Sequence, residues 1–112
     1  KLCILGGGLT GLSLAKSLTK KGLSIDIFLN KKKSDLDRSR TIGISNDNLM
    51  YFNKEILDIK KLFWDIKKIE IYSENLRNEK ILNFENNNKT IFAIIRNYQL
   101  QSKLLKSLKK DN

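Results

Sequence analysis

The sequence predicts an α/β domain in which a central parallel sheet is joined to an added β-meander, and two observations lead to this expectation. The first 30 residues hold two short apolar segments on either side of one helical segment, which is the order of a β-α-β unit. The remainder holds three strand-like segments with period-two alternation or β-rich composition, together with two amphipathic helical segments. We therefore expect one mixed unit rather than an all-helical or all-β fold.

The composition allows a folded core and excludes several kinds of site. The chain has 112 residues, 40% of them hydrophobic, and 22 Lys+Arg against 12 Asp+Glu give a formal net charge of +10. No apolar run approaches the roughly 20 residues of a transmembrane helix. With one cysteine and no histidine, an internal disulfide and Cys/His metal sites are excluded. We expect no metal and a reducing, cytoplasmic compartment.

The positive charge raises the alternative of a basic nucleic-acid-binding module. The lysines, however, occur as scattered pairs and one triplet, and arginine is scarce. Proteins that recognise nucleic acids depend on arginine and on interleaved aromatic side chains. Because the chain is rich in Lys, Asn and Ile together, AT-rich codon usage explains the composition, and we expect no nucleic-acid partner.

The N-terminal elements follow from short apolar patterns. Leu2 to Leu5 form an apolar run that ends at a glycine cluster, which is typical of a strand buried on both faces. Residues 9–21 predict a helix with Ala15 on its apolar side and Gly22 as the residue after its end. A second strand is predicted over 24–29, which completes the β-α-β unit.

The helix and strands predicted after residue 40 rest on weaker hydrophobic periodicity than the first three elements. After a polar stretch over 30–40, Ser45 is predicted to cap a helix that carries Leu49, Phe52 and Ile56 on one face. Strand candidates then lie at 66–73, 80–84 and 90–95, and three consecutive asparagines separate the last two. These segments predict a meander or hairpins.

A last amphipathic helix closes the chain. Asn97 is its predicted N-cap, and its apolar positions are Leu100, Leu104, Leu105 and Leu108, with lysines opposite. Because the chain has no proline and no break in composition, we find no linker and treat residues 1–112 as one continuous unit.

The strongest motif lies between the first strand and the first helix. Gly6-Gly7-Gly8-Leu9-Thr10-Gly11 satisfies G-x-G-x-x-G in the strand-to-helix context that this motif requires. In a dinucleotide site, Gly6 allows the tight turn, Gly8 lets the backbone approach a pyrophosphate, and Gly11 permits close packing of helix on strand. Ala15, four residues later, continues the small-residue seam. The pattern predicts a Rossmann-like FAD/NAD(P)-binding domain.

Two other interpretations of this segment stay open. It could be a signal peptide, with Lys1 as the charged end, an apolar region over 2–12 and a small-residue cleavage site at Ser13-Leu14-Ala15. The four glycines argue against this because they break the apolar helix. The other interpretation is a glycine-rich turn without a ligand.

The end of the second strand departs from the usual dinucleotide pattern, which places an acidic residue there to bind the ribose hydroxyls. This position holds Leu29, followed by Asn30. Asn30 is the candidate acceptor, and Asp35 or Asp37 could fold back from the loop. The triplet Lys31 to Lys33 could alternatively bind the 2′-phosphate of NADP or be a solvated loop.

Two further segments, together with the glycine motif, resemble the FAD-dependent aromatic hydroxylases of the para-hydroxybenzoate hydroxylase type, most closely their ubiquinone-biosynthesis branch. Arg40-Thr41-Ile42-Gly43-Ile44-Ser45 is similar to the family's Asp-x-Arg-x-x-Ala-Leu-like segment, with the acidic residue displaced to Asp37. Ile95-Arg96-Asn97-Tyr98-Gln99-Leu100, followed by Leu104, is similar to its Ile-x-Asn-x-x-Leu-x-x-x-Leu-like helix start. The resemblance implies that Arg40 and Asn97 contact the cofactor. By the residues alone, they could be a surface arginine and a helix cap.

The resemblance implies an FAD-dependent monooxygenase that hydroxylates an aromatic small molecule, such as a ubiquinone precursor with or without a prenyl tail. NAD(P)H would reduce the flavin, and molecular oxygen would be the oxidant. The family's later motifs have no counterpart, so residues 1–112 are expected to be the N-terminal part of the FAD-binding domain, inactive alone and without a catalytic residue that we can name. The family also implies peripheral contact of the full-length enzyme with the inner membrane. The NAD(P)-binding domain of another oxidoreductase is the alternative.

Overall fold

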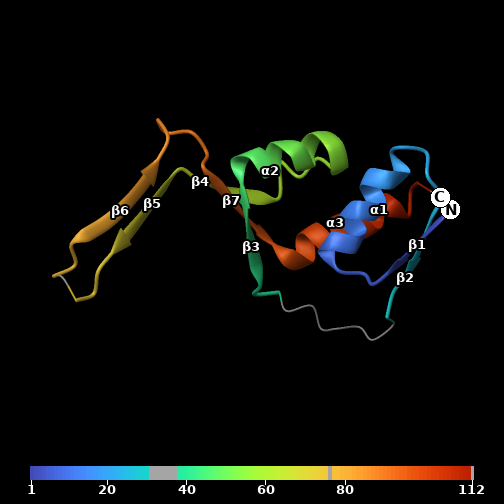
Figure 1. Cartoon of the computed structure of the whole chain (residues 1–112), viewed down its shortest axis with the longest axis horizontal. Helices are drawn as coiled ribbons and strands as arrows, with labels where there is room; N and C mark the ends of the chain where they lie inside the picture. The colour runs from blue at the N-terminus through green and yellow to red at the C-terminus, as the bar shows by residue number, and fades with distance from the viewer. Residues whose placement is uncertain (31–37, 76, 112) are drawn as a thin grey trace.

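A β-α-β unit forms the N-terminal part of the computed structural model, which describes residues 1–30, 38–75 and 77–111. β1 (Leu2–Leu5) leads into α1 (Leu9–Thr19), and β2 (Ile25–Phe28) returns parallel to β1 (Figure 1). The predicted order is therefore confirmed. The helix ends at Thr19 rather than at the predicted residue 21, because the chain turns there and reaches Gly22 at a φ of +76°.

The second sheet corrects the predicted meander. β3 (Thr41–Ser45), β4 (Phe63–Ile66) and β7 (Phe92–Arg96) form an antiparallel sheet in the order β3-β7-β4. Ile95 of β7 pairs with a residue of each neighbour, so the last strand lies in the middle. The described strands thus form three small sheets, of which only the β1–β2 pair is parallel, instead of one central parallel sheet with a meander.

β3 is a strand that the sequence analysis did not predict. Its middle residue, Gly43, is a poor strand former, but here it allows a close approach. A Cβ at Gly43 would lie 2.0 Å from Cε1 of Phe92, so the aromatic ring of β7 occupies the space above the glycine. The strand depends on this long-range contact, which a local pattern cannot reveal.

The helical segment after β3 begins as predicted. The Ser45 Oγ accepts a hydrogen bond from the N–H of Asn48 at 3.4 Å and caps α2 (Asn46–Tyr51). The helix then widens into the π-helix η1 (Phe52–Ile56), whose last turn is closed by the Leu57 N–H and the Phe52 carbonyl at 2.9 Å.

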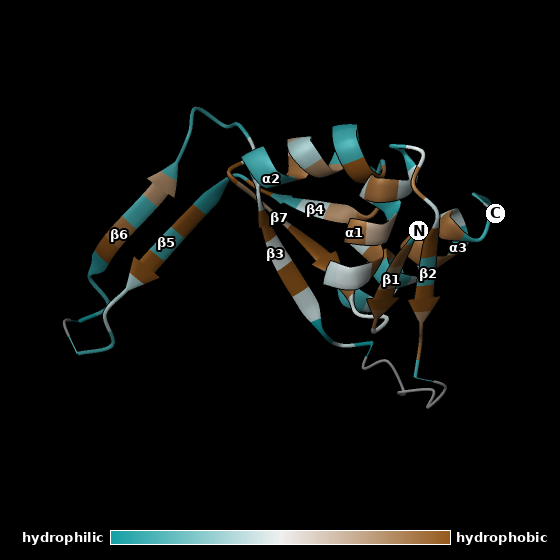
Figure 2. Cartoon of the chain, turned by 45° about the vertical axis from the view of Figure 1, so that its right-hand side comes forward, coloured by the Kyte–Doolittle hydropathy of each residue, from teal (hydrophilic) through white to brown (hydrophobic). Residues whose placement is uncertain are grey.

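A hairpin of β5 (Lys68–Tyr72) and β6 (Lys80–Glu85) projects from the rest of the molecule (Figure 1). Hydrophilic and hydrophobic residues alternate along both strands (Figure 2). On the polar face, Glu70 binds Lys68 at 2.5 Å and Lys80 at 2.9 Å, so an ion pair joins the two strands. Hydrogen bonds from Lys68, Tyr72 and Lys80 lower the pKa of Glu70 to about 2.

The last helix, α3 (Asn97–Leu108), packs against α1, and together they form much of the core. Its N-cap is Arg96 and not Asn97, which is a correction: Asn97 is already helical, and no side chain caps this end. The core combines α1, α3, the α2–η1 segment and the middle strand β7, and its buried residues are Leu12, Ala15, Leu49, Ile56, Ile59, Ala93, Ile95, Leu100, Leu104 and Leu108.

An ion pair joins α1 to the end of α3. The Nζ of Lys16 lies 2.6 Å from Oδ2 of Asp111, and the Thr19 hydroxyl donates to the same oxygen at 3.2 Å. The Lys16 side chain is only 9% exposed. The hydrogen bond from Lys16 holds the pKa of Asp111 below its ordinary value of 3.8.

This ion pair makes the stability of the protein sensitive to acid. The pKa of Asp111 is lower in the folded state than in the unfolded state. The ion pair therefore contributes fully to the free energy of unfolding above pH about 4, and this contribution disappears as the pH falls through the folded pKa. We expect Asp111→Asn to lower the free energy of unfolding at pH 7 by about 1 to 3 kcal/mol, since it leaves the buried Lys16 ammonium without an anion. Urea denaturation of both proteins from pH 7 to pH 2 measures this difference.

The matched control is Asp26→Asn. Asp26 forms an ion pair with Lys1 at 2.9 Å, but the two side chains are 49% and 69% exposed. We expect Asp26→Asn to lower the free energy of unfolding by less than about 1 kcal/mol at any pH. Equal effects of the two substitutions, or an Asp111→Asn effect that persists at pH 2, would contradict the role of the buried pair.

Candidate functional site

The glycine loop turns the chain from β1 into α1 in a conformation that needs glycine. Gly6 has a φ of +112°, which side-chain-bearing residues rarely adopt. Its N–H donates to the Phe28 carbonyl at 2.9 Å, so the end of β2 lies beside the start of the loop. The loop therefore sits at the carboxyl ends of both parallel strands, where ligands bind in open α/β sheets.

Gly11 brings the helix against the strand. A Cβ at Gly11 would lie 2.9 Å from the carbonyl oxygen of Gly6 and 3.3 Å from Cγ2 of Ile4. Ala15, one turn later, is fully buried. The small residues thus hold α1 close to β1, as predicted for this motif.

Gly8 has open space beside it. It is the N-cap of α1, with a φ of −72° and a ψ of 169° that any residue can adopt, and nothing lies within 4 Å of a Cβ built there. The first helical hydrogen bond runs from the Leu12 N–H to the Gly8 carbonyl, so the N–H groups of Leu9, Thr10 and Gly11 have no acceptor within the helix. Free N–H groups and the positive end of the helix dipole together attract an anion.

The start of α3 brings Arg40 and Asn97 together. The backbone N–H of Asn97 donates to the Arg40 carbonyl at 3.0 Å, while the Arg40 residue is exposed just before β3. The Oδ1 atom of Asn97 is buried and has no hydrogen-bond partner among the described residues. A buried amide oxygen without a donor is unfavourable by itself and suits a site that a bound ligand completes.

Gln101 is a residue that the sequence analysis missed. It lies one turn after Asn97 on the same face of α3, and its Nε2 donates to the Gly7 carbonyl at 2.7 Å. This bond links the glycine loop to α3 across 94 residues of sequence. No local pattern marks Gln101, because the helical periodicity predicts only which residues are buried.

Asn30, the expected acceptor for the ribose hydroxyls, lies just beyond the end of β2. β2 ends at Phe28, and Asn30 is an exposed residue on the chain that leaves the strand. Leu29 is half exposed and leans over the loop, since a Cβ at Gly7 would lie 2.4 Å from its Cδ2. The lysine triplet at 31–33 and the two aspartates at 35 and 37 lie outside the described residues.

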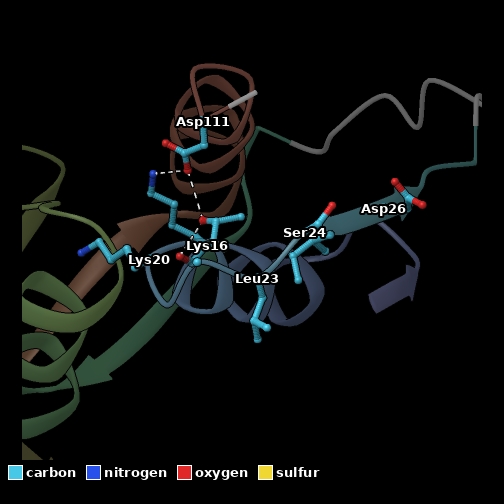
Figure 3. Close-up of a pocket in the computed structure, with 9 residues that line it drawn as sticks. Lys16, Lys20, Leu23, Ser24, Asp26 and Asp111 are labelled. Carbon is cyan, nitrogen blue, oxygen red and sulfur yellow. Dashed lines mark hydrogen bonds and ion pairs between the residues drawn. The ribbon is translucent and has the colours of Figure 1, made fainter. Parts of the chain in front are cut away.

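A cavity of about 620 Å³ lies at the opposite end of α1 (Figure 3). Lys16, Lys20, Leu23, Ser24, Asp26 and Asp111 line it. An 11-residue helix separates this cavity from the glycine loop, a distance of roughly 16 Å along the axis. The cavity is therefore not the space in which the loop could bind a dinucleotide.

Clustered metal ligands and membrane-spanning helices are both absent from the described residues. Within 1–30, 38–75 and 77–111, no three His, Cys, Asp or Glu side chains gather as metal ligands. No helix in the described part of the chain is long and apolar enough to cross a membrane.

Comparison with known proteins gives a fold likeness. No protein-family model and no curated protein sequence matches the chain. Among solved structures, HpxO of Klebsiella pneumoniae, complexed with FAD and uric acid, is similar with a TM-score of 0.73 and 18% identity over 98% of this chain. The 2,6-dihydroxypyridine-3-hydroxylase of Arthrobacter nicotinovorans has a TM-score of 0.68 and 14% identity over 95% of this chain. A 2-methyl-3-hydroxypyridine-5-carboxylic acid oxygenase has a TM-score of 0.67 and 21% identity over 99%.

The likeness covers nearly the whole chain but only part of each neighbour. The chain spans 26% to 29% of the length of these three proteins. At such low identities the comparison shows a shared fold and not a shared activity. The shared fold is that of a segment of these three proteins, one of which, HpxO, holds FAD in its crystal structure.

The contacts of the glycines predict two different outcomes of substitution. Gly11→Val should lower the free energy of unfolding by about 1 to 3 kcal/mol or more, because the side chain would overlap the Gly6 carbonyl and Ile4. Gly8→Val should lower it by less than about 1 kcal/mol, since only the preference for glycine at the cap is lost. Thermal or urea denaturation of the ligand-free variants measures both.

Similar stabilities for the two valine variants would contradict this assignment. In that case α1 would not depend on a close approach to β1 at Gly11. A Gly8→Val variant that is much less stable than Gly11→Val would show that the space beside Gly8 is filled in the folded protein.

Proposed function

We propose that this chain is the FAD-binding segment of a flavin-dependent monooxygenase that hydroxylates an aromatic or heteroaromatic ring. The single observation that carries the proposal is the open space beside Gly8 at the free N-terminus of α1, on a loop at the carboxyl ends of two parallel strands. The fold likeness to HpxO, which binds FAD, supports flavin over other dinucleotides. The Rossmann-like character of the site rests on this β-α-β unit.

The residues of the site divide between the two halves of FAD. The N–H groups from Gly8 to Gly11 would bind the pyrophosphate, whose negative charge the net charge of +10 also attracts. Gly6 and Gly11 would shape the turn, and Asn30 would bind the ribose. On the other side, Arg40 and the buried Oδ1 of Asn97 would meet the flavin half.

Bound FAD would supply the redox chemistry, taking electrons from NAD(P)H and using molecular oxygen to hydroxylate the substrate ring. The chain itself would orient the cofactor through its backbone N–H groups and keep water from the Asn97 amide. The part of this chain is therefore to bind and orient the cofactor, and no acid or base among the site residues takes a catalytic role.

The substrate class follows from two kinds of support. Two of the structural neighbours are named for the hydroxylated pyridines on which they act, and the third, HpxO, is complexed with uric acid. All of these compounds are electron-rich rings. The order of the glycine motif, the Arg40 segment and the Ile95–Leu100 segment, in contrast, most closely resembles the ubiquinone-biosynthesis branch. We propose a ubiquinone precursor as the substrate, and a hydroxylated heteroaromatic ring is the alternative that activity assays of the complete enzyme would separate.

The proposal is tested by titrating FAD into the intact protein and into Gly8→Val. We expect the wild-type protein to bind FAD with a characteristic flavin spectrum. The FAD dissociation constant of Gly8→Val should be at least about a hundredfold higher, because the side chain fills the space that the pyrophosphate needs. Fluorescence quenching of FAD gives both dissociation constants. Circular dichroism of the ligand-free variant checks that its fold is retained.

Three results would overturn the proposal in different ways. Absence of FAD binding, together with tight binding of NADP, would favour an NAD(P)-dependent oxidoreductase instead. Binding of neither dinucleotide, with salt-dependent binding of DNA or RNA, would favour the basic nucleic-acid-binding module. Equal FAD affinity of wild type and Gly8→Val would place the cofactor away from the loop.

Leu29 gives a separate prediction. A leucine cannot accept the ribose hydrogen bonds, and a missing charge-assisted bond reduces affinity by about ten- to a hundredfold. We therefore expect Leu29→Glu to tighten FAD binding, while Asn30→Ala should weaken it if Asn30 is the substitute acceptor. Titration of FAD into the three proteins measures this, and identical affinities would show that the ribose is held elsewhere.

A further inference from the structure

The peptide between Gly7 and Gly8, like that between Gly6 and Gly7, is one of the most easily reoriented bonds of the loop. Both of its flanking residues lack side chains, so the two torsions that rotate this peptide plane meet little steric resistance. Rotation by about 180° would exchange the directions of the Gly7 carbonyl and the Gly8 N–H. The loop backbone alone does not determine whether the Gly7 carbonyl or the Gly8 N–H points toward a ligand.

Gln101 supplies that selection. Its Nε2 lies 2.7 Å from the Gly7 carbonyl oxygen, and because the partner is a carbonyl, the amide nitrogen is the donor. The described part of the chain contains no cis peptide bond, so the Gly8 N–H points opposite to the Gly7 carbonyl. With the carbonyl held toward α3, this N–H is directed away from α3.

The orientation matters for an anion. A Gly8 N–H that is directed outward adds one donor to those of Leu9, Thr10 and Gly11 at the start of α1. In the rotated form, the Gly7 carbonyl would present a partial negative charge on that side instead. A pyrophosphate would then lose a donor and meet a repelling oxygen.

The bond is also mechanically supported. Gln101 is half-buried on α3, between the fully buried Leu104 and the nearly fully buried Leu100 in sequence. α3 in turn packs against α1 and is joined to it by the ion pair of Lys16 and Asp111 at the far end. The donor is therefore carried by a helix that cannot shift without breaking the core.

We propose that Gln101 is a positioning residue that holds the Gly7–Gly8 peptide in the orientation that binds the pyrophosphate of a dinucleotide. It acts through the loop backbone and need not touch the cofactor. This inference rests on the proposed function, because the pyrophosphate is its ligand.

The test compares Gln101→Met with the matched control Gln99→Met, on the same helix, in the intact protein. Methionine has a similar length to glutamine but no donor. We expect the FAD dissociation constant of Gln101→Met to rise about three- to tenfold, and that of Gln99→Met to stay within about twofold of wild type. Gln101→Asn, shorter by one methylene, serves as a second variant that keeps a polar side chain but cannot reach the carbonyl.

A spectroscopic measurement separates positioning from a loss of stability. In the ligand-free protein, the carbonyl carbon resonance of Gly7 and the amide resonance of Gly8 should shift or broaden in Gln101→Met and Gln101→Asn, and remain unchanged in Gln99→Met. A general loss of stability would instead affect resonances throughout α3.

The outcomes are distinguishable. Wild-type protein that binds no FAD would overturn the proposed function and this inference with it. Wild-type protein that binds FAD, with unchanged affinity in both Gln101 variants, would overturn this inference alone. Unchanged resonances at Gly7 and Gly8 would overturn it as well, even if the affinity fell.

Discussion

The close approach of α1 to β1 at Gly11 is the constraint on which the rest of the site depends. The space for a Cβ there is occupied by the Gly6 carbonyl and the Ile4 side chain. Because the helix starts so near the end of the strand, the chain must turn within Gly6 to Gly8, and Gly6 takes a left-handed conformation to do so. The same tight turn leaves the first N–H groups of α1 without helical acceptors.

The packing of α3 on α1 extends this constraint to the second half of the chain. Leu12 of α1 and Leu104 of α3 are both fully buried in the shared core. The ion pair of Lys16 and Asp111 ties the helices at one end, and the hydrogen bond from Gln101 to Gly7 ties α3 to the loop at the other. The loop, α1 and the start of α3 therefore form one rigid arrangement around the open space beside Gly8.

The features that sequence reasoning predicted are those with local causes. The Gly6 turn and the Ser45 cap depend on residues within one turn or one short loop, and the β-α-β unit with its close approach at Gly11 is complete within the first 28 residues. The missed features have distant causes. β3 depends on the Phe92 ring above Gly43, and β7 enters the sheet between two strands that precede it in the chain.

The same distinction applies to the candidate site. The spacing of glycines is written in the sequence, whereas Gln101 reaches Gly7 only because α3 folds back onto the loop. Asn97 was predicted to cap α3, but the N-cap is Arg96, and the Asn97 N–H instead meets the carbonyl of Arg40. A shift of one residue thus changes the Asn97 amide from a cap into a buried acceptor without a partner among the described residues.

A crystal structure of the protein with FAD is the most direct test of the central claim, which is that the glycine loop and the start of α3 hold the two halves of one cofactor. The account predicts pyrophosphate oxygens within hydrogen-bond distance of the N–H groups at the start of α1, and a donor from the cofactor on the Asn97 Oδ1. FAD bound in the cavity beside Lys16 and Asp111, with the loop free of phosphate, would contradict it.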